Sequence, residues 1–455
     1  MADSPPTHHS AVTPATTPSE AQTTLADGRR RAEDLSPVRR WSIFAALMVP
    51  YVFYAFCWNT EDFLRPYAAE SLKLSRVQVT TFYSLQALGS LIGAIVLSQW
   101  ADRRGRRRAL VATALGIGIA AIGVLLVHDY ATALVQRFVM GFFLGGVYGT
   151  VVGLYVGLFS PTVRGFLAGT VILVFNGGDA LLAWIGRLYG PTDWREVLVI
   201  GGIGSLASAV VVWLAVPRDG TVIPWNAPST ARTASSKDIS IKELFAHGRW
   251  RVTLRLALLC GLNFFAYQAF NGWITTYLRE VYGMSPDQVG RLVAMLFVGS
   301  MAGALPWGIV ADRFGRRANA LGFALAAVLI VVYLRMPPTP LNFVVVGFAY
   351  GFCLVTSGIW GPYFAELYPD HLRAMAASIF QWGRIVSLFG AVLAGAIAQR
   401  FGLATTMQVG SVTFALAAVI WWSLPETLAR ANARRAPALP QSAGRAAHSH
   451  GEEGT

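Results

Sequence analysis

The chain has 455 residues, of which 54% are hydrophobic and only 13% are charged. A soluble globular domain carries about 25% charged residues, so this composition excludes a disordered protein and disfavours a soluble enzyme. The formal charge of +13 is compatible with nucleic-acid binding, but in a membrane protein it is explained by the Arg and Lys of cytoplasmic connections. We therefore expect a lipid bilayer, and no nucleic acid, as the macromolecular surroundings.

Apolar stretches of the length that crosses a bilayer, about 20 residues, recur along the whole chain. They predict an all-α membrane protein with twelve transmembrane helices in two six-helix bundles. The first six helices are expected at residues 42–66, 79–100, 108–127, 131–158, 165–187 and 195–216. The other six are expected at residues 253–278, 288–310, 319–335, 341–366, 373–398 and 402–424.

Polar segments separate and flank these helices. Residues 1–41 and 428–455 are predicted to be disordered tails, and residues 217–252 a linker between bundles at 42–216 and 253–427. Most Arg and Lys fall in the tails and the even-numbered connections, including Arg29–Arg31, Arg103–Arg108 and Arg313–Arg317. This bias predicts a multi-pass protein of the bacterial inner membrane with both termini in the cytoplasm. Cys57, Cys260 and Cys353 lie in apolar runs without metal-binding spacing, so we expect no metal. No cofactor is expected either, and the protein is expected to be a monomer.

Two short motifs occur once in each half of the chain. The sequence D-R-x-G-R-R begins at Asp102 and again at Asp312, 210 residues later. A second pair, Pro161–Arg164 and Pro369–Arg373, follows at nearly the same offset. Parallel six-helix repeats imply a two-fold axis along the membrane normal and a central cavity between the halves.

The repeated loop resembles the signature loop of the major facilitator superfamily. Arg137–Gly141 is similar to the R-x-x-x-G motif of that superfamily, and Glu366–Arg373 is similar to its E-x-x-P-x-x-x-R motif. The resemblance implies transport by alternating access and a gate in the two loops. We expect the gate to comprise Asp102, Gly105, Arg106, Asp312, Gly315, Arg316, Glu366 and Arg373. The glycines suit tight turns that need free backbone angles.

Within the superfamily the chain is similar to bacterial metabolite:proton symporters, in the branch of the sialate, lactate/pyruvate and aromatic-acid permeases. Trp273–Leu278 resembles their W-x-P-T-Y-L, and Gly383-Arg384 resembles a G-R pair in the sialate and lactate/pyruvate permeases. The D-G-x-D of aromatic-acid permeases is absent, because Tyr54–Cys57 stands there. The resemblance to this branch nevertheless implies proton symport of a mono- or aromatic carboxylate. A neutral-solute symporter of the sugar type and a non-transporting sensor are the alternatives.

Ionisable residues inside the predicted helices are candidates for proton coupling, since each is costly in a bilayer. No histidine lies in a predicted helix, so coupling requires a carboxylate. Asp62 and Arg137 are expected at similar depth and in contact, with Glu61 as a second carboxylate. The alternative is that the two acids lie in the headgroup region at the end of the first helix. Asp179 is expected to relay protons or to pair with Arg137.

Arg384, near the middle of its helix, is expected to hold the substrate carboxylate by two-point contact; a structural partner such as Asp179 is the alternative. A polar face of helix 253–278 is expected to line the cavity. The candidate substrate-binding residues are Arg384, Gln381, Asn263, Tyr267, Gln268, Asn271, Trp360 and Tyr363. The two aromatic residues either line an apolar wall or pack between helices.

Overall fold

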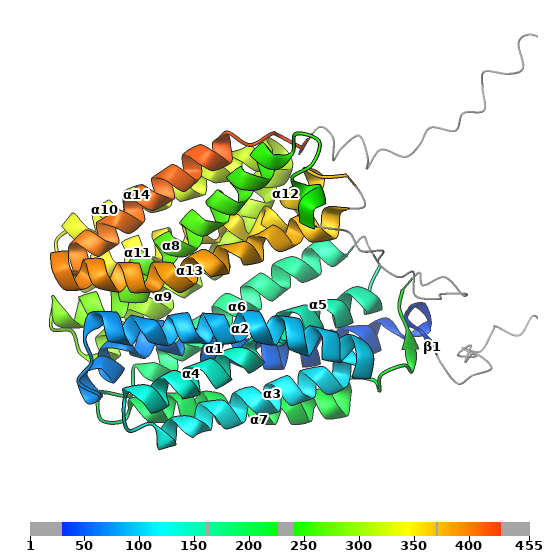
Figure 1. Ribbon diagram of the computed structural model, residues 1–455, viewed down its shortest axis with the longest axis horizontal. Helices are drawn as coiled ribbons and strands as arrows, with labels where there is room; N and C mark the ends of the chain where they lie inside the picture. Colours follow the sequence, from blue (N-terminus) through cyan, green and yellow to red (C-terminus); the bar gives the residue numbers. More distant parts are fainter. Residues whose placement is uncertain (1–29, 161–162, 226–240, 370–371, 429–455) are drawn as a thin grey trace, which may run out of the picture.

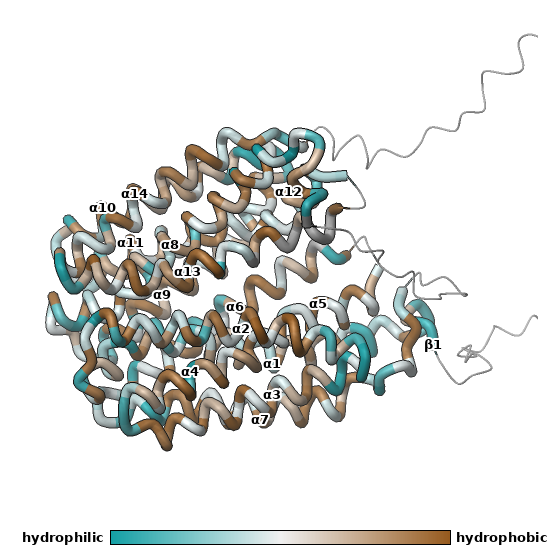
Figure 2. Tube along the Cα trace, viewed as in Figure 1, coloured by the Kyte–Doolittle hydropathy of each residue, from teal (hydrophilic) through white to brown (hydrophobic). Residues whose placement is uncertain are grey.

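The computed structural model describes residues 30–160, 163–225, 241–369 and 372–428. Within this part of the chain, twelve helices are long and apolar enough to cross a membrane, as the sequence predicts. Figure 1 shows them as two bundles that lie side by side. Hydrophobic residues follow the lengths of the helices, and hydrophilic residues gather at their ends (Figure 2).

The helices of each bundle begin and end within a few residues of the predicted bounds. The first bundle comprises α1 (Pro37–Ser71), α2 (Arg76–Arg104), α3 (Arg106–Ile122) with η2 (Gly123–Leu126), α4 (Tyr130–Gly145) with α5 (Val147–Leu158), α6 (Arg164–Gly186) and α7 (Trp194–Ala215). The second comprises α8 (Trp250–Glu280), α9 (Pro286–Phe314), η4 (Arg316–Asn319) with α10 (Ala320–Arg335), α11 (Pro340–Leu354) with η5 (Val355–Ile359) and α12 (Trp360–Glu366), α13 (Arg373–Phe401) and α14 (Leu403–Trp422).

The two ends of the bundles differ in charge. The arginine-rich face carries residues 103–108 and 313–317, and the arginine-poor face carries the connections 72–75 and 281–285. At the arginine-poor face, α2 and α9 begin with the same capping box, formed by Ser75 with Gln78 and by Ser285 with Gln288. Each box satisfies two backbone N–H groups that the first helical turn leaves unpaired. The repeat of the two halves thus extends to how their helices start.

Glycines allow one pair of helices in each bundle to pack very closely. A Cβ atom at Gly89 or Gly141 would meet the backbone of the opposite helix in the pair α2–α4, and one at Gly299 or Gly351 would do so in the pair α9–α11. Small residues let helix backbones approach in this way within a membrane. The same tight pair therefore stabilises both halves.

The first tail and the linker are more ordered than predicted. Helix α1 begins at Pro37, and strand β1 (Arg30–Arg31) pairs in parallel with β2 (Val222–Ile223). A further 3-10 helix, η1 (Ala32–Asp34), joins β1 to α1, and η3 (Ile241–Leu244) precedes α8. The prediction missed them because such short elements carry no hydrophobic period. Most of the predicted tails and the middle of the linker lie outside the described residues.

Contacts between the bundles close the arginine-poor face. Helix α2 packs on α13, α6 on α9, and α1 on α8. Ion pairs join the bundles at the rim, where Arg187 lies 2.8 Å from Asp287 and Arg76 lies 2.7 Å from Glu280. The bundles are thereby tied together at the end opposite to the arginine-rich loops.

Candidate transport site

Among the described residues, six charged side chains lie in the interior of the two bundles. Five of them are less than a tenth exposed: Glu61, Asp62, Arg65, Arg137 and Asp179. The sixth, Arg384 on α13, is half-buried. A charge at this depth is costly unless it is paired or used, so each of these groups needs a partner or a task.

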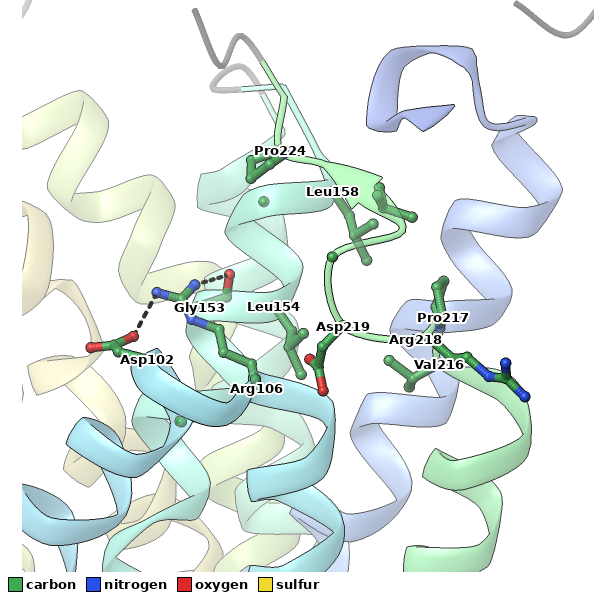
Figure 3. A pocket seen from close by; sticks show the side chains of 15 residues that line it. Asp102, Arg106, Gly153, Leu154, Leu158, Val216, Pro217, Arg218, Asp219 and Pro224 are labelled. Carbon is green, nitrogen blue, oxygen red and sulfur yellow. Dashed lines mark hydrogen bonds and ion pairs between the residues drawn. The ribbon is translucent and has the colours of Figure 1, made fainter. Parts of the chain in front are cut away.

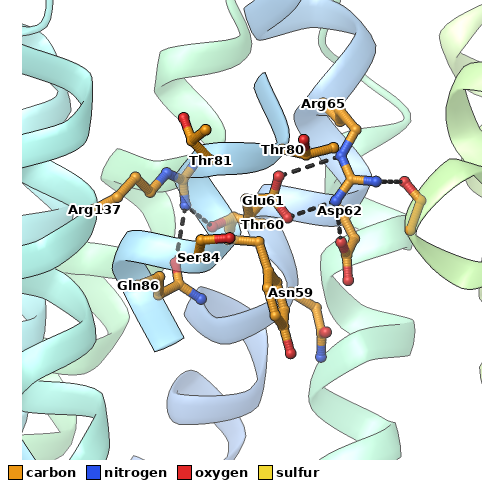
Figure 4. Close-up of polar contacts among 12 residues, drawn as sticks. Asn59, Thr60, Glu61, Asp62, Arg65, Thr80, Thr81, Ser84, Gln86 and Arg137 are labelled. Carbon is orange, nitrogen blue, oxygen red and sulfur yellow. Dashed lines mark hydrogen bonds and ion pairs between the residues drawn. The ribbon is translucent and has the colours of Figure 1, made fainter. Parts of the chain in front are cut away.

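The predicted contact between Asp62 and Arg137 is wrong, because Arg65 takes the place of Arg137. The Arg65 guanidinium lies 2.6 Å from Asp62 Oδ1 and 2.8 Å from Glu61 Oε2 (Figure 4). Residues three and four apart share one face of a helix, and α1 continues to Ser71. The sequence analysis placed Arg65 at the end of a shorter helix and so missed this partner.

Arg137 is satisfied by neutral groups. Its Nη1 donates to Thr60 Oγ1 at 3.0 Å and to Gln86 Oε1 at 3.4 Å (Figure 4). Gln86 in turn donates from Nε2 to the carbonyl of Trp58 at 2.8 Å. Arg137 therefore fixes the relative positions of α1, α2 and α4, and its positive charge balances the nearby acids without direct contact.

Asp62 has one carboxylate oxygen without a partner. Oδ1 accepts from Arg65, while Oδ2 is buried and has no hydrogen bond. The side chains of Glu61 and Asp62 are 1% and 9% exposed, so both acids are buried among the helices. An unpaired oxygen on a buried carboxylate is a place where a proton is readily accommodated.

Asp179 pairs with neither Arg137 nor Arg384. Its Oδ1 accepts from Asn59 Nδ2 at 2.5 Å. Asn59 Oδ1 accepts in turn from the Tyr267 hydroxyl at 3.4 Å. This chain of contacts links α6, α1 and α8, and so crosses between the bundles.

Arg384 faces aromatic side chains of the opposite bundle. Its guanidinium carbon lies 4.5 Å from the ring centroid of Trp58, and Nη2 donates to the Tyr54 hydroxyl at 3.4 Å. Its Nε atom is buried without a hydrogen bond, and among the described residues no carboxylate pairs with it. Rings of Tyr51, Tyr54 and Phe175 cluster beside it, with centroids 5.2–6.2 Å apart. Arg384 thus offers hydrogen-bond donors next to an aromatic surface.

Of the polar residues predicted along α8, Tyr267 and Asn271 line a space that residues of the first bundle also line. Asn271 accepts from the Tyr350 hydroxyl at 2.6 Å, and both amide atoms of Gln268 are buried without partners. Asn263 is buried further along the same helix. A space of about 20 Å³, hardly larger than one water molecule needs, is lined by Asn59, Asp62, Tyr267, Asn271 and Thr275 among others. The side chain of Gln381 lies outside the described residues.

Trp360 and Tyr363 do not line a cavity between the bundles, which corrects their assignment as substrate-binding residues. Trp360 is 1% exposed and packs on Phe323 and Trp421 inside the second bundle. The Tyr363 hydroxyl donates to the carbonyl of Pro425 at 2.9 Å. Large rings fill gaps between helices as readily as they line a site, and the sequence could not distinguish these uses. The aromatic surface near Arg384 comes instead from α1 and α6.

The two predicted gate loops share a backbone geometry. Gly105 and Gly315 have φ angles of 107° and 101°, which other residues rarely adopt. Asp312 lies 2.7 Å from Arg316, which also pairs with Glu366 at 3.0 Å. In the first half Asp102 lies 3.5 Å from Arg106, whose Nη1 donates to the carbonyl of Gly153 at 2.7 Å (Figure 3). The side chain of Arg373 lies outside the described residues.

Sequence analysis missed a carboxylate that follows each bundle and binds back to its gate loop. Asp219 accepts from the backbone N–H groups of Arg107 and Arg108, at 2.8 and 3.2 Å. Glu426 accepts likewise from Arg316 and Arg317, at 2.9 and 3.0 Å. The available signal was an acid one or two residues after a proline in both Pro217–Asp219 and Pro425–Glu426. Each acid stabilises the start of the helix that follows the loop.

Comparison with known proteins identifies the class of protein that this arrangement represents. The family model of the Major Facilitator Superfamily matches residues 43–285 and 256–448. The chain belongs to this superfamily and is a multi-pass membrane transporter, not an enzyme.

The chain is similar to several bacterial transporters. It is 25% identical over 393 residues to the gallate transporter of Pseudomonas putida, a match that covers 79% of this chain and 85% of that protein. It is 26% identical over 372 residues to the cis,cis-muconate transport protein of Acinetobacter baylyi, covering 78% and 88% of the two chains. Among solved structures, a bacterial homologue of the lysosomal transporter Spinster, in an inward-facing conformation, matches with a TM-score of 0.70 at 16% identity and covers 85% of this chain and 97% of that one. This structural likeness concerns the fold alone.

Proposed function

We propose that this protein is a proton-coupled symporter of the bacterial inner membrane that imports a small organic carboxylate by alternating access. The observation that carries the proposal is Arg384, a half-buried guanidinium that faces aromatic rings and has no carboxylate partner among the described residues. A guanidinium binds carboxylates through two parallel N–H donors. A planar substrate with a carboxylate would contact Arg384 with one end and the rings of Tyr54 and Phe175 with its body.

The names of relatives support a carboxylate as cargo. Gallate, cis,cis-muconate and 3-(3-hydroxyphenyl)propionate, which appear in the names of three related transporters, are all carboxylates. The cluster of Tyr51, Tyr54, Trp58 and Phe175 favours an aromatic carboxylate, because ring contacts of this kind stabilise by about 0.5–1.5 kcal/mol each.

The buried charges support coupling to one proton. Three carboxylates and three guanidinium groups share the centre: Glu61, Asp62, Asp179, Arg65, Arg137 and Arg384. Fully ionised, this set is neutral. One carboxylate anion together with one proton leaves it neutral, whereas an anion alone adds an uncompensated charge that a low-dielectric interior disfavours. We assign the proton to Asp62, whose Oδ2 atom has no partner.

The charge asymmetry supports the orientation. Arginine-rich connections remain in the cytoplasm, so the arginine-rich face is the cytoplasmic face in this proposal, and both termini are cytoplasmic. The closed arginine-poor face then faces the periplasm, and the conformation opens inward. We propose that the monomer is the transporting unit.

Uptake into proteoliposomes tests the proposal. The purified protein is reconstituted with an alkaline interior, and accumulation of labelled gallate, benzoate, lactate and glucose is measured with and without a protonophore. Accumulation of a carboxylate that the protonophore abolishes is the expected result. Accumulation of glucose alone, carboxylate uptake that ignores the pH gradient, or no flux of any of these solutes would overturn the proposal.

A further inference from the structure

Arg65 is held by two acids of its own helix. Its Nε donates to Glu61 Oε1 at 3.2 Å, and its Nη2 donates to both Glu61 Oε2 and Asp62 Oδ1 (Figure 4). The residue is 1% exposed. These bonds determine the direction of the guanidinium group, which leaves Nη1 pointing away from α1.

The remaining nitrogen of Arg65 reaches the other bundle. Nη1 donates to the backbone carbonyl of Gly272 on α8. The guanidinium carbon also lies 4.9 Å from the ring centroid of Trp273, close enough for a cation–π contact. A single buried side chain therefore connects the two bundles between the central cavity and the arginine-poor face.

Gly272 provides the space into which Arg65 fits. A Cβ atom at this position would lie 2.7 Å from Arg65 Nη1, 3.1 Å from Gln268 Oε1 and 3.3 Å from Asp62 Oδ1. The distance to Arg65 Nη1 is shorter than packed atoms tolerate, and the other two are tight contacts that a small shift would relieve. Any other residue at position 272 would therefore push the guanidinium away from α8.

The other charge pairs that join the bundles are more exposed. The side chains of Arg76 and Glu280 are 34% and 42% exposed, those of Arg187 and Asp287 are 19% and 41% exposed, and those of Arg279 and Glu70 are 20% and 59% exposed. Exposed ion pairs contribute little to stability, whereas a buried hydrogen bond from a charged donor, such as that from Arg65 to the Gly272 carbonyl, contributes more. The contact of Arg65 is thus the cross-bundle charge contact most able to bias the conformation.

We propose that Arg65 is a latch that holds the arginine-poor face closed. Its guanidinium occupies the space beside Gly272, and its hydrogen bonds to Glu61 and Asp62 orient it. The latch is a positioning element and does not itself contact the substrate. Its link to coupling rests on the proposed function, because the carboxylate that we assign to the proton is one of the two that aim Arg65. Other ionisable groups around it are Tyr83 on α2, Arg137 on α4, Asp179 on α6 and Tyr267 on α8.

A distance measurement between spin labels tests the latch without substrate or pH gradient. Cys57, Cys260 and Cys353 are replaced by alanine, and labels are attached at His128→Cys and Pro338→Cys, exposed positions at the arginine-poor ends of opposite bundles. Gly272→Ala keeps every charge and places its Cβ closest to the Arg65 guanidinium. We expect Gly272→Ala to raise severalfold the fraction of molecules in which the two labels are far apart. Gly308→Ala is the matched control, because a Cβ there meets nothing within 4 Å.

A second variant tests the latch in case Gly272→Ala prevents folding. Arg65→Gln is expected to give the same shift, with Arg255→Gln as its control, since Arg255 is exposed and donates to the Ser423 carbonyl of its own bundle. Unchanged distances in folded, monodisperse Gly272→Ala protein would overturn the latch, and so would an equal shift in the Gly308→Ala control. If Gly272→Ala shifts the distances but carboxylate accumulation by the wild type ignores the pH gradient, the latch stands and the proposed coupling fails.

Discussion

The guanidinium of Arg384 stacks on the ring of Trp58, a residue of the opposite bundle, with 4.5 Å between the guanidinium carbon and the ring centroid. Stacking occupies one face of the guanidinium and leaves its edge free, since N–H donors lie in the plane of the group. The contact therefore leaves N–H donors free at the junction of the two bundles, where the proposed carboxylate would bind.

Replacing Arg384 with lysine is expected to weaken carboxylate binding. Lysine keeps the positive charge but cannot form two parallel hydrogen bonds, and a hydrogen bond to a charged group contributes about 1.5–3 kcal/mol. The Kd measured by calorimetry should rise roughly ten- to a hundredfold. Arg255→Lys is the control, because Arg255 is exposed and donates to the Ser423 carbonyl within its own bundle. Wild-type affinity in the Arg384 variant would contradict the assignment.

Replacing Trp58 with leucine is expected to reduce the preference for aromatic over aliphatic carboxylates. The variant loses the ring on which Arg384 rests and part of the aromatic cluster, contacts of about 0.5–1.5 kcal/mol each. Competition of benzoate against lactate for uptake measures the preference. Trp422→Leu serves as the control, since Trp422 is 61% exposed on α14. An unchanged ratio would remove the cluster from substrate recognition.

Asp62→Asn is expected to abolish accumulation driven by a pH gradient and to preserve counterflow exchange of substrate. Asparagine has the same shape, and Arg65 keeps its pair with Glu61, but the side chain no longer exchanges a proton. Both activities are measured in the same proteoliposomes. Glu196→Gln, an exposed change at the start of α7, should leave both intact. Gradient-driven accumulation by the Asp62 variant would exclude this residue from coupling.

Glu426→Gln is expected to lower the thermal stability at neutral pH. Burial raises the pKa of Glu426, but backbone N–H donors of Arg317, Arg316, Leu428 and Thr427 outweigh burial and hold it below the ordinary value. A lowered pKa means that the charge stabilises the fold above the pKa of an unfolded glutamate, about 4.3, and that this stabilisation is lost as the pH falls further. Loss of such a helix cap costs about 1 kcal/mol.

Thermal-shift curves of detergent-solubilised protein at pH 7 and pH 4 measure this effect. The difference in Tm between wild type and Glu426→Gln should be present at pH 7 and smaller at pH 4. The matched change Glu196→Gln should show no difference at either pH. An equal difference at both pH values would mean that the carboxylate charge has no part in the stabilisation.

The predicted helices and the repeat agree with the structure because both depend on local patterns. A run of apolar residues is sufficient to define a membrane span, and Asp102 and Asp312 mark the same turn in each half. The capping boxes at Ser75 and Ser285 lie 210 residues apart, and the acids Asp219 and Glu426 lie 207 residues apart. Both pairs recur at about the same offset as the gate loops, so they could also have been predicted from the sequence.

Partners of the buried charges were not accessible in the same way. The sequence analysis paired Asp62 with Arg137 from their depth, yet Arg65 on the same helix takes that position. Likewise Trp360 packs inside the second bundle, whereas Trp58 of the first bundle faces Arg384. Side-chain direction around a helix decides both outcomes, and it depends on neighbouring helices that composition does not reveal.

The sequence alone determined that this chain crosses a membrane twelve times as two related halves, because hydrophobic length and repeated turn motifs act within short segments. Only the tertiary structure decided which charges meet and where the halves are tied together. Those contacts join residues of separate helices, such as Arg65 with Gly272, and their geometry follows from helix packing and helix rotation.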